Sequence, residues 1–142
     1  MQYKDLNLKI NTETKKVSGL DIEVLQFLPI QDKIDLIDIA LQKSEQDGIY
    51  NEMKLEMYFN LYIIYLYTNL VFNEEDRIDE FTLYNELESN DIISKVIAAI
   101  PEEEYDFLFD TLQIMKKNSI KYKNSVASVL NSFIKDLPKN AE

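Results

Sequence analysis

The chain has 142 residues and a formal net charge of −11, and it contains no histidine, no cysteine and no tryptophan. These absences exclude a Ser–His–Asp triad, a cysteine nucleophile, a disulfide and the usual histidine or cysteine metal centres. We therefore expect a binding or structural protein rather than an enzyme, with no cofactor and no bound metal.

The negative charge is concentrated in the middle of the chain. Residues 73–115 carry 13 acidic and 2 basic side chains, whereas residues 116–142 carry 2 acidic and 6 basic ones. Nucleic acid and anionic lipid repel a surface of this kind, so we expect neither direct nucleic-acid binding nor membrane binding. A basic protein or a second copy of the chain is the better electrostatic match.

The length of the chain predicts one domain, residues 1–142, large enough to bury roughly two thirds of the surface that the unfolded chain exposes. The first residues are polar and lack the basic-then-apolar order of a signal peptide, which favours use without export.

The first 28 residues are predicted to form a short β-arm or hairpin, and residues 29–137 a helical body. Apolar residues alternate with polar ones before a break at Ser18 and Gly19, and more apolar residues follow the break; they are Leu6, Leu8, Ile10, Ile22, Val24 and Leu25. Alternation is typical of a strand with one buried face. Pro29 then stands where a first helical turn tolerates proline, and the first helix is expected to continue to Gly48.

Residues 52–72 are predicted to be the central helix, because apolar side chains nearly encircle it. A membrane span is the alternative, but Asn60, Thr68 and Asn69 interrupt the run and the apolar part is shorter than the ~20 residues that a span needs. The tyrosines of this helix suit either a core or an interface; they are Tyr58, Tyr62, Tyr65 and Tyr67.

Four further helices are expected. Asn73 predicts the N-cap of a third helix, with Ile78, Phe81, Tyr84 and Leu87 on its inner face. A short fourth helix follows Asn90, a fifth begins at Pro101, and a last one runs from about Ser119 to Leu137. The predicted fold is mainly α, a compact bundle of about six helices around residues 52–72 with a short N-terminal β-arm.

Two acidic runs, at residues 73–80 and 102–110, are candidates for a divalent-cation site or for paired catalytic carboxylates. The first run lacks the alternating ligands and central glycine of an EF-hand loop. No carboxylate stands isolated among apolar residues that would raise its pKa. The positive end of a helix dipole accounts for first-turn acids. The acidic candidates for a protein contact are Glu74, Glu75, Asp79 and Glu80.

A basic cluster lies where the last two predicted helices meet; it consists of Lys116, Lys117, Lys121 and Lys123. Lysines at this point would complement the carbonyl end of the preceding helix. Alternatively, they form a patch that meets the acidic segment 73–110 of a neighbouring copy, as in a ring or a lattice.

Three stretches carry a resemblance to a known group of proteins: FLPIQDKIDLI at residues 27–37, YTNLVF at residues 67–72 and AIPEEEY at residues 99–105. From about residue 20 to its end, the chain resembles small structural and assembly proteins of tailed phages and prophages of low-GC Gram-positive bacteria. The resemblance implies a minor head, neck or tail component, or a helper of assembly, but it carries over no functional residue.

The expected function is that of a non-enzymatic phage virion or morphogenesis protein. It would act through contacts with other phage structural proteins or with further copies of itself, in the virion and, during assembly, in the host cytoplasm. The arm at residues 4–25 is the first candidate for contact. Two alternatives stay open: an acidic inhibitor that mimics DNA to block a host defence protein, and a tail-assembly chaperone absent from the mature particle.

Overall fold

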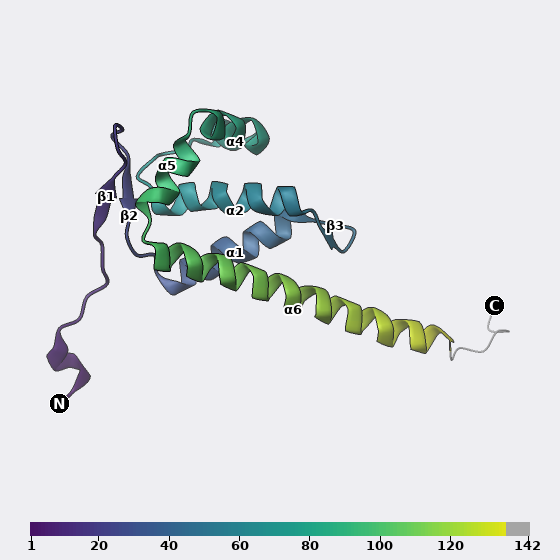
Figure 1. Ribbon diagram of the computed structural model, residues 1–142. Helices are drawn as coiled ribbons and strands as arrows, with labels where there is room; N and C mark the ends of the chain where they lie inside the picture. The colour runs from purple at the N-terminus through teal and green to yellow at the C-terminus, as the bar shows by residue number, and fades with distance from the viewer. Residues whose placement is uncertain (136–142) are drawn as a thin grey trace.

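The computed structural model describes the backbone of residues 1–135 and the side chains of residues 1–119. Over this part of the chain the fold is mainly helical, with a small hairpin near the N-terminus, which confirms the predicted class. Figure 1 shows a body of packed helices from which two elements project, the N-terminal segment on one side and the end of the last helix on the other.

The N-terminal hairpin pairs β1 (Thr14–Lys16) with β2 (Glu23–Leu25) in antiparallel register, with Lys15 opposite Val24. Its turn contains Gly19 in the left-handed region (φ 77°), which glycine adopts without strain. The hairpin therefore turns at the predicted break. The alternating residues Leu6, Leu8 and Ile10 form no paired strand, because residues 3–6 form the 3₁₀ helix η1 (Tyr3–Leu6) and residues 7–12 pair with no strand of the described chain; of the two predicted forms, this part is an arm and not a hairpin.

Helix α1 (Ile30–Ser44) ends at a second, two-residue hairpin, β3 (Glu45–Gln46) with β4 (Ile49–Tyr50). The two turn residues, Asp47 (φ 54°) and Gly48 (φ 81°), both have positive φ, as tight hairpin turns require. The sequence therefore predicted the end of this helix but not the hairpin that follows.

Helix α2 (Glu52–Tyr67) is the centre of the core, as predicted. It begins after Asn51, whose side chain accepts a hydrogen bond from the backbone N–H of Lys54 at 3.0 Å. It ends before residue 72, because Thr68 turns into extended conformation and bridges to Val24 of β2. Its fully buried residues are Leu61, Ile63, Ile64 and Tyr67.

The segment predicted as a third helix is two helices, α3 (Glu74–Arg77) and α4 (Glu80–Ser89). Asn73 and Asp76 form the capping box of α3, and Asp79 starts α4 by accepting a hydrogen bond from the backbone N–H of Thr82. This restart rotates the chain, so Ile78 is 82% exposed whereas Leu83 is buried. The predicted inner face is therefore wrong at Ile78.

Helix α5 (Ile92–Ala99) ends before Pro101, as expected. The two helices predicted after Pro101 are a single helix, α6 (Glu102–Lys135), which packs on α1 through buried Leu108 and Leu112 and then extends past the body (Figure 1). Nothing in the sequence between residues 102 and 135 breaks a helix, since this stretch contains neither proline nor glycine.

Candidate interaction surfaces

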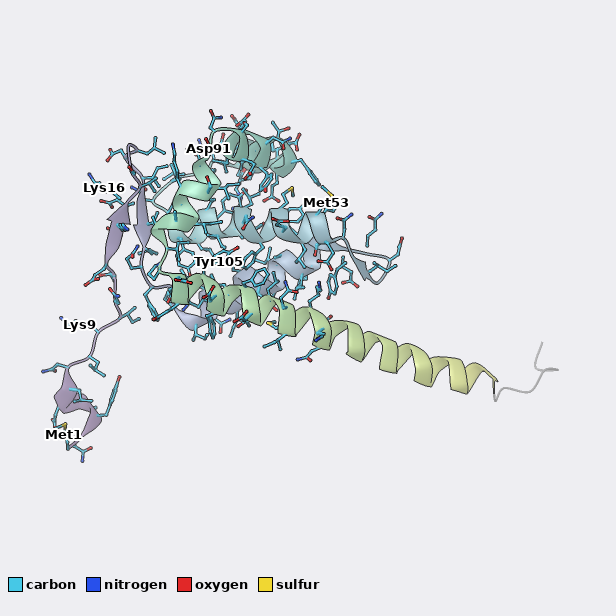
Figure 2. All side chains as sticks on the ribbon, viewed as in Figure 1. Met1, Lys9, Lys16, Met53, Asp91 and Tyr105 are labelled. Atoms are coloured by element: carbon cyan, nitrogen blue, oxygen red, sulfur yellow. The ribbon has the colours of Figure 1, made fainter. Side chains whose placement is uncertain are left out.

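The N-terminal arm, defined here as residues 1–13, carries a series of exposed apolar side chains. Its 3₁₀ turn is closed by reciprocal hydrogen bonds between Gln2 and Asp5, and Asn7 then leaves it in the left-handed conformation. The predicted contact residues Leu6, Leu8 and Ile10 are 49%, 65% and 66% exposed. Single exposed apolar residues are ordinary, but a series along one projecting segment makes the arm a candidate interaction surface; Figure 2 shows the segment from Met1 to Lys9 projecting from the body.

The acidic residues predicted for contact are divided between solvent and the fold. Glu74 and Glu75 are exposed in the first turn of α3. Asp79 is also exposed, but its carboxylate caps α4 by accepting hydrogen bonds from the backbone N–H of Thr82 at 3.2 Å and from its hydroxyl at 2.7 Å. These two hydrogen bonds lower the pKa of Asp79 below its ordinary value, because both stabilise the ionised form.

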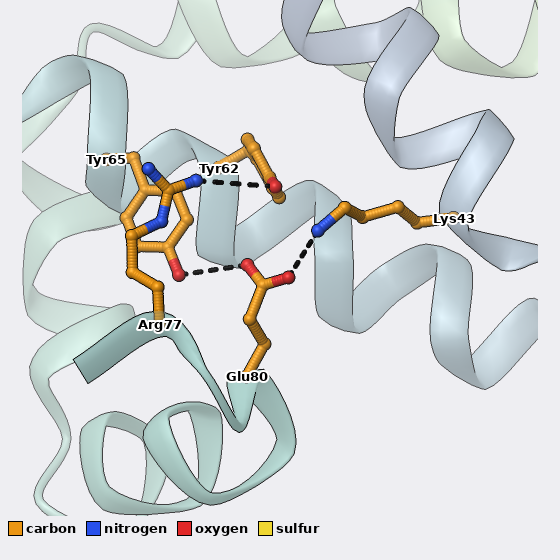
Figure 3. Close-up of polar contacts among 5 residues, drawn as sticks. All are labelled: Lys43, Tyr62, Tyr65, Arg77 and Glu80. Atoms are coloured by element: carbon orange, nitrogen blue, oxygen red, sulfur yellow. Dashed lines mark hydrogen bonds and ion pairs between the residues drawn. The ribbon is translucent and has the colours of Figure 1, made fainter. Parts of the chain in front are cut away.

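Glu80 lies inside a polar network between α1, α2 and α4, which Figure 3 shows. Its side chain is 11% exposed and contacts the Lys43 ammonium, and it accepts a hydrogen bond from the Tyr65 hydroxyl at 3.0 Å. Burial and this carboxylate raise the pKa of Tyr65 far above its ordinary value. The Arg77 guanidinium lies 4.3 Å from the centre of the Tyr65 ring. Glu80 therefore holds α4 against the body rather than facing a partner.

The predicted basic cluster is divided in a similar way. The Lys116 ammonium lies 2.6 Å from Glu52 at the start of α2, whereas Lys117 is exposed. The side chains of Lys121 and Lys123 lie outside the described residues. Because α6 is continuous here, there is no carbonyl end for these lysines to complement. Lys116 instead links α6 to α2.

A groove separates the first half of α2 from α6 and has a volume of about 290 Å³. Leu55 and Phe59 from α2 and Leu112 from α6 form its buried floor, and the Phe109 ring at its edge is 45% exposed. The Tyr105 ring joins the floor to the edge, with its centre 6.1 Å from that of Phe59 and 6.4 Å from that of Phe109. We call this hollow the α2–α6 groove.

The rim of the α2–α6 groove is acidic. Glu52 and Glu56 line it, and both are exposed. Glu52 is paired with Lys116, whereas Glu56 forms no hydrogen bond or ion pair within the described chain. Burial raises the pKa of Tyr105, and the charge of Glu56 raises it further. The groove also contains Asn60, which is 8% exposed and whose Oδ1 atom has no hydrogen-bond partner among the described residues.

A second polar network, which sequence reasoning missed, is buried between α1, α2 and α6. The Lys33 ammonium lies 3.0 Å from Oε1 of Glu104, and the Tyr67 hydroxyl donates a hydrogen bond to Oε2 at 2.8 Å. Phe27 and Phe107 place their rings 4.6 Å and 5.2 Å from the same ammonium. The available signal was the spacing of Lys33, which lies one helical turn before the buried residues Leu36 and Ile37.

Searches of the described residues find no group of three or more metal-ligating side chains. In the same part of the chain, no helix is long and apolar enough to cross a membrane. Comparisons of the sequence and the structure with protein-family models, with curated proteins and with solved structures found no match. The proposed function therefore rests on the surfaces described above.

Proposed function

We propose that this chain is a non-enzymatic phage virion or morphogenesis protein whose N-terminal arm makes the principal contact with another subunit. The observation that carries the proposal is the exposure of Leu6, Leu8 and Ile10 on a segment that projects from the body (Figure 1). The phage assignment itself comes from the sequence resemblance.

The arm has the properties of an adaptable docking element. It contributes no residue to the buried core, which begins at Val17, so the body does not depend on it for apolar contacts. From residue 8 to residue 12 its backbone forms no backbone hydrogen bond within the described chain, whereas the Glu13 carbonyl already accepts one from Gln26, so the N–H and C=O groups of residues 8–12 are open to a partner. Peptide segments of this kind dock by adding a strand to a sheet edge or by placing alternate side chains in pockets.

Within residues 73–80, the placement of the acids favours this contact over DNA mimicry. Asp79 and Glu80 are used to start α4 and to hold it on the body, and Asp76 closes the capping box of α3. A surface that imitates the phosphates of DNA needs carboxylates that face a partner. In the segment from residue 73 to 80, only Glu74 and Glu75 are exposed without such a use.

The test is to follow the chain into particles of the phage whose genome encodes it. Mass spectrometry of gradient-purified particles should find the intact chain at a fixed ratio to the major structural proteins. Deletion of residues 2–11 should abolish incorporation while leaving the helical circular-dichroism spectrum unchanged. Val71→Asp is the control, since Val71 is an apolar residue outside the arm that is even more exposed, at 85%, than Leu6, Leu8 and Ile10.

The opposite results distinguish the alternatives. An intact chain that is abundant in the lysate and missing from particles would overturn the virion assignment and favour a chaperone or a host-directed inhibitor. Unchanged incorporation of the deletion variant would overturn the role of the arm.

A further inference from the structure

The arm and the α2–α6 groove match in length. When residues 8–12, which follow the left-handed Asn7, are extended, they span about 13 Å. The stretch of α2 from Glu52 to Asn60 that borders the groove rises by about 12 Å. Alternate side chains of an extended segment share one face, so Leu8 and Ile10 would both point toward the groove floor.

The two surfaces also match in chemistry. The floor offers the apolar and aromatic side chains of Leu55, Phe59 and Phe109, and its rim carries the unpaired carboxylate of Glu56. The arm carries Lys4 and Lys9 among its apolar residues, and both are exposed. An ammonium near Glu56 would supply the cation that this carboxylate lacks within the described chain, and aromatic rings also attract cations.

We infer that the α2–α6 groove of one copy binds the N-terminal arm of a second copy, with Leu8 over the aromatic floor and Lys9 beside Glu56. The inference rests on the proposed function, in which the arm is the contact element, and it names the receiving surface. A second copy is the occupant because no residue of the chain's own arm lines the groove: residues 8–11 border a different hollow beside Phe27, and the N-terminal turn projects from the body (Figures 1 and 2).

Such a contact is heterologous, since the arm and the groove are different parts of the chain. Each copy that gives its arm to one neighbour still has a groove for the next. A heterologous contact closes into a ring if the rotation between neighbours permits it and otherwise continues as a filament. The assembly would therefore form without the acidic segment 73–80.

The absence of native cysteine permits a background-free cross-linking test on the purified chain. Leu8→Cys is placed on the arm in one sample and Gln113→Cys in the groove of another, and the two are mixed under oxidising conditions. We expect a disulfide-linked dimer that contains one copy of each variant. Asp21→Cys replaces Gln113→Cys in the control mixture, because its exposed side chain lies on the hairpin turn, away from the groove, and should give no such dimer.

Two results would overturn the inference. One is the absence of the mixed dimer at high protein concentration. The other is a disulfide formed within single chains of the Leu8→Cys/Gln113→Cys double variant, which would place the arm in its own groove. If neither cross-link forms but deletion of the arm still abolishes incorporation, the proposed function stands and the arm binds a different subunit.

Sedimentation measures the same contact without cysteines. Leu8→Asp should weaken self-association by roughly tenfold or more, since it replaces a buried leucine by a charge. Val71→Asp should leave it unchanged. Lys9→Glu and Glu56→Lys should each weaken association several-fold, and the chain that carries both changes should recover. Failure of the double variant to recover, with both single variants weakened, would reject the pairing of Lys9 with Glu56.

Discussion

The buried pair of Lys33 and Glu104 provides the sharpest prediction of stability. The two side chains are 8% and 12% exposed, so water screens their interaction only weakly. Glu104→Gln keeps the shape of the side chain and its contact with Tyr67, but it leaves the Lys33 ammonium without a counter-charge. Breaking a buried ion pair by removing one partner costs about 3–5 kcal/mol.

We expect Glu104→Gln to lower the free energy of unfolding by about 3 kcal/mol, the lower end of that range. The amide oxygen can still accept a hydrogen bond from Lys33, and the Phe27 and Phe107 rings remain beside the ammonium. For a chain of this length the loss corresponds to a decrease in melting temperature of about 10 °C. In urea the midpoint should fall by about 1–2 M.

Urea denaturation followed by far-UV circular dichroism measures this loss. The matched control is Lys33→Met/Tyr67→Phe/Glu104→Met, which removes both charges and the Tyr67 hydroxyl that would otherwise lose its acceptor, and fills the space with apolar atoms. This triple variant should come within about 1 kcal/mol of the wild type, because replacing a buried polar network by apolar residues is often neutral or stabilising. A loss below about 1 kcal/mol for Glu104→Gln alone would refute the reasoning, since it would mean that the pair is effectively solvated.

Three further predictions concern single positions. Burial and the Glu104 carboxylate raise the pKa of Tyr67 above the value of about 10 that tyrosine has in the unfolded chain. The stabilisation by the protonated hydroxyl is therefore complete below about pH 10 and is lost progressively as the pH rises above it. Above about pH 10, Tyr67→Phe should make the decrease of the unfolding free energy with pH less steep by about 1.4 kcal/mol per pH unit. Asn60→Leu should raise the melting temperature, with a gain of up to about 1 kcal/mol, because it removes the unpaired Oδ1 atom; a lower melting temperature would mean that the hydrogen bond between Asn60 and Tyr84, which is lost as well, contributes more. Gly48→Ala should cost about 1 kcal/mol in thermal unfolding, because Gly48 has φ +81° with open space around it, whereas Gly48→Asn should cost less; equal losses would contradict a purely conformational cause.

The sequence predicted best those features that depend on neighbouring residues. The helix start at Asn73, the stop at Pro101 and the encircled apolar pattern of α2 are all local signals. Local signals could not decide whether Leu6, Leu8 and Ile10 belong to a hairpin or to an extended arm. Alternation specifies which face a strand would bury, but a strand also needs a hydrogen-bonded neighbour, and none lies beside residues 6–10 in the described chain.

The predicted number of helices, about six, agrees with the number in the described chain only because two errors offset each other. Asp79 was read as one acid in a run, although its position before Thr82 makes it a second N-cap that divides the third helix. A new helix was expected to begin at about Ser119, but α6 passes through this residue, and the Ser119 hydroxyl hydrogen-bonds the Tyr50 hydroxyl at 2.7 Å. A capping residue starts a helix only where the chain is free to leave the previous one.

The candidate surfaces were predictable only in part, because burial of a charge depends on residues far away in sequence. Glu80 is 37 residues from Lys43, and Lys33 is 71 residues from Glu104. No local pattern reveals these pairs. The exposed apolar residues of the arm were identified as contact candidates from sequence, whereas the α2–α6 groove brings together helices that are distant in the chain.

The placement of the charges also bears on how the chain would respond to salt. Four of the 13 acidic side chains of residues 73–115 are used within the fold, at the caps of α3 and α4 and in the two networks around Glu80 and Glu104, whereas the other nine are exposed. If the arm and the groove associate, most of the contact is apolar, and a single exposed pair such as Lys9 with Glu56 contributes little. Self-association should therefore decrease only modestly between low and physiological salt, whereas binding through the exposed carboxylates would fall steeply over the same range, because salt screens exposed charges far more than it weakens apolar burial.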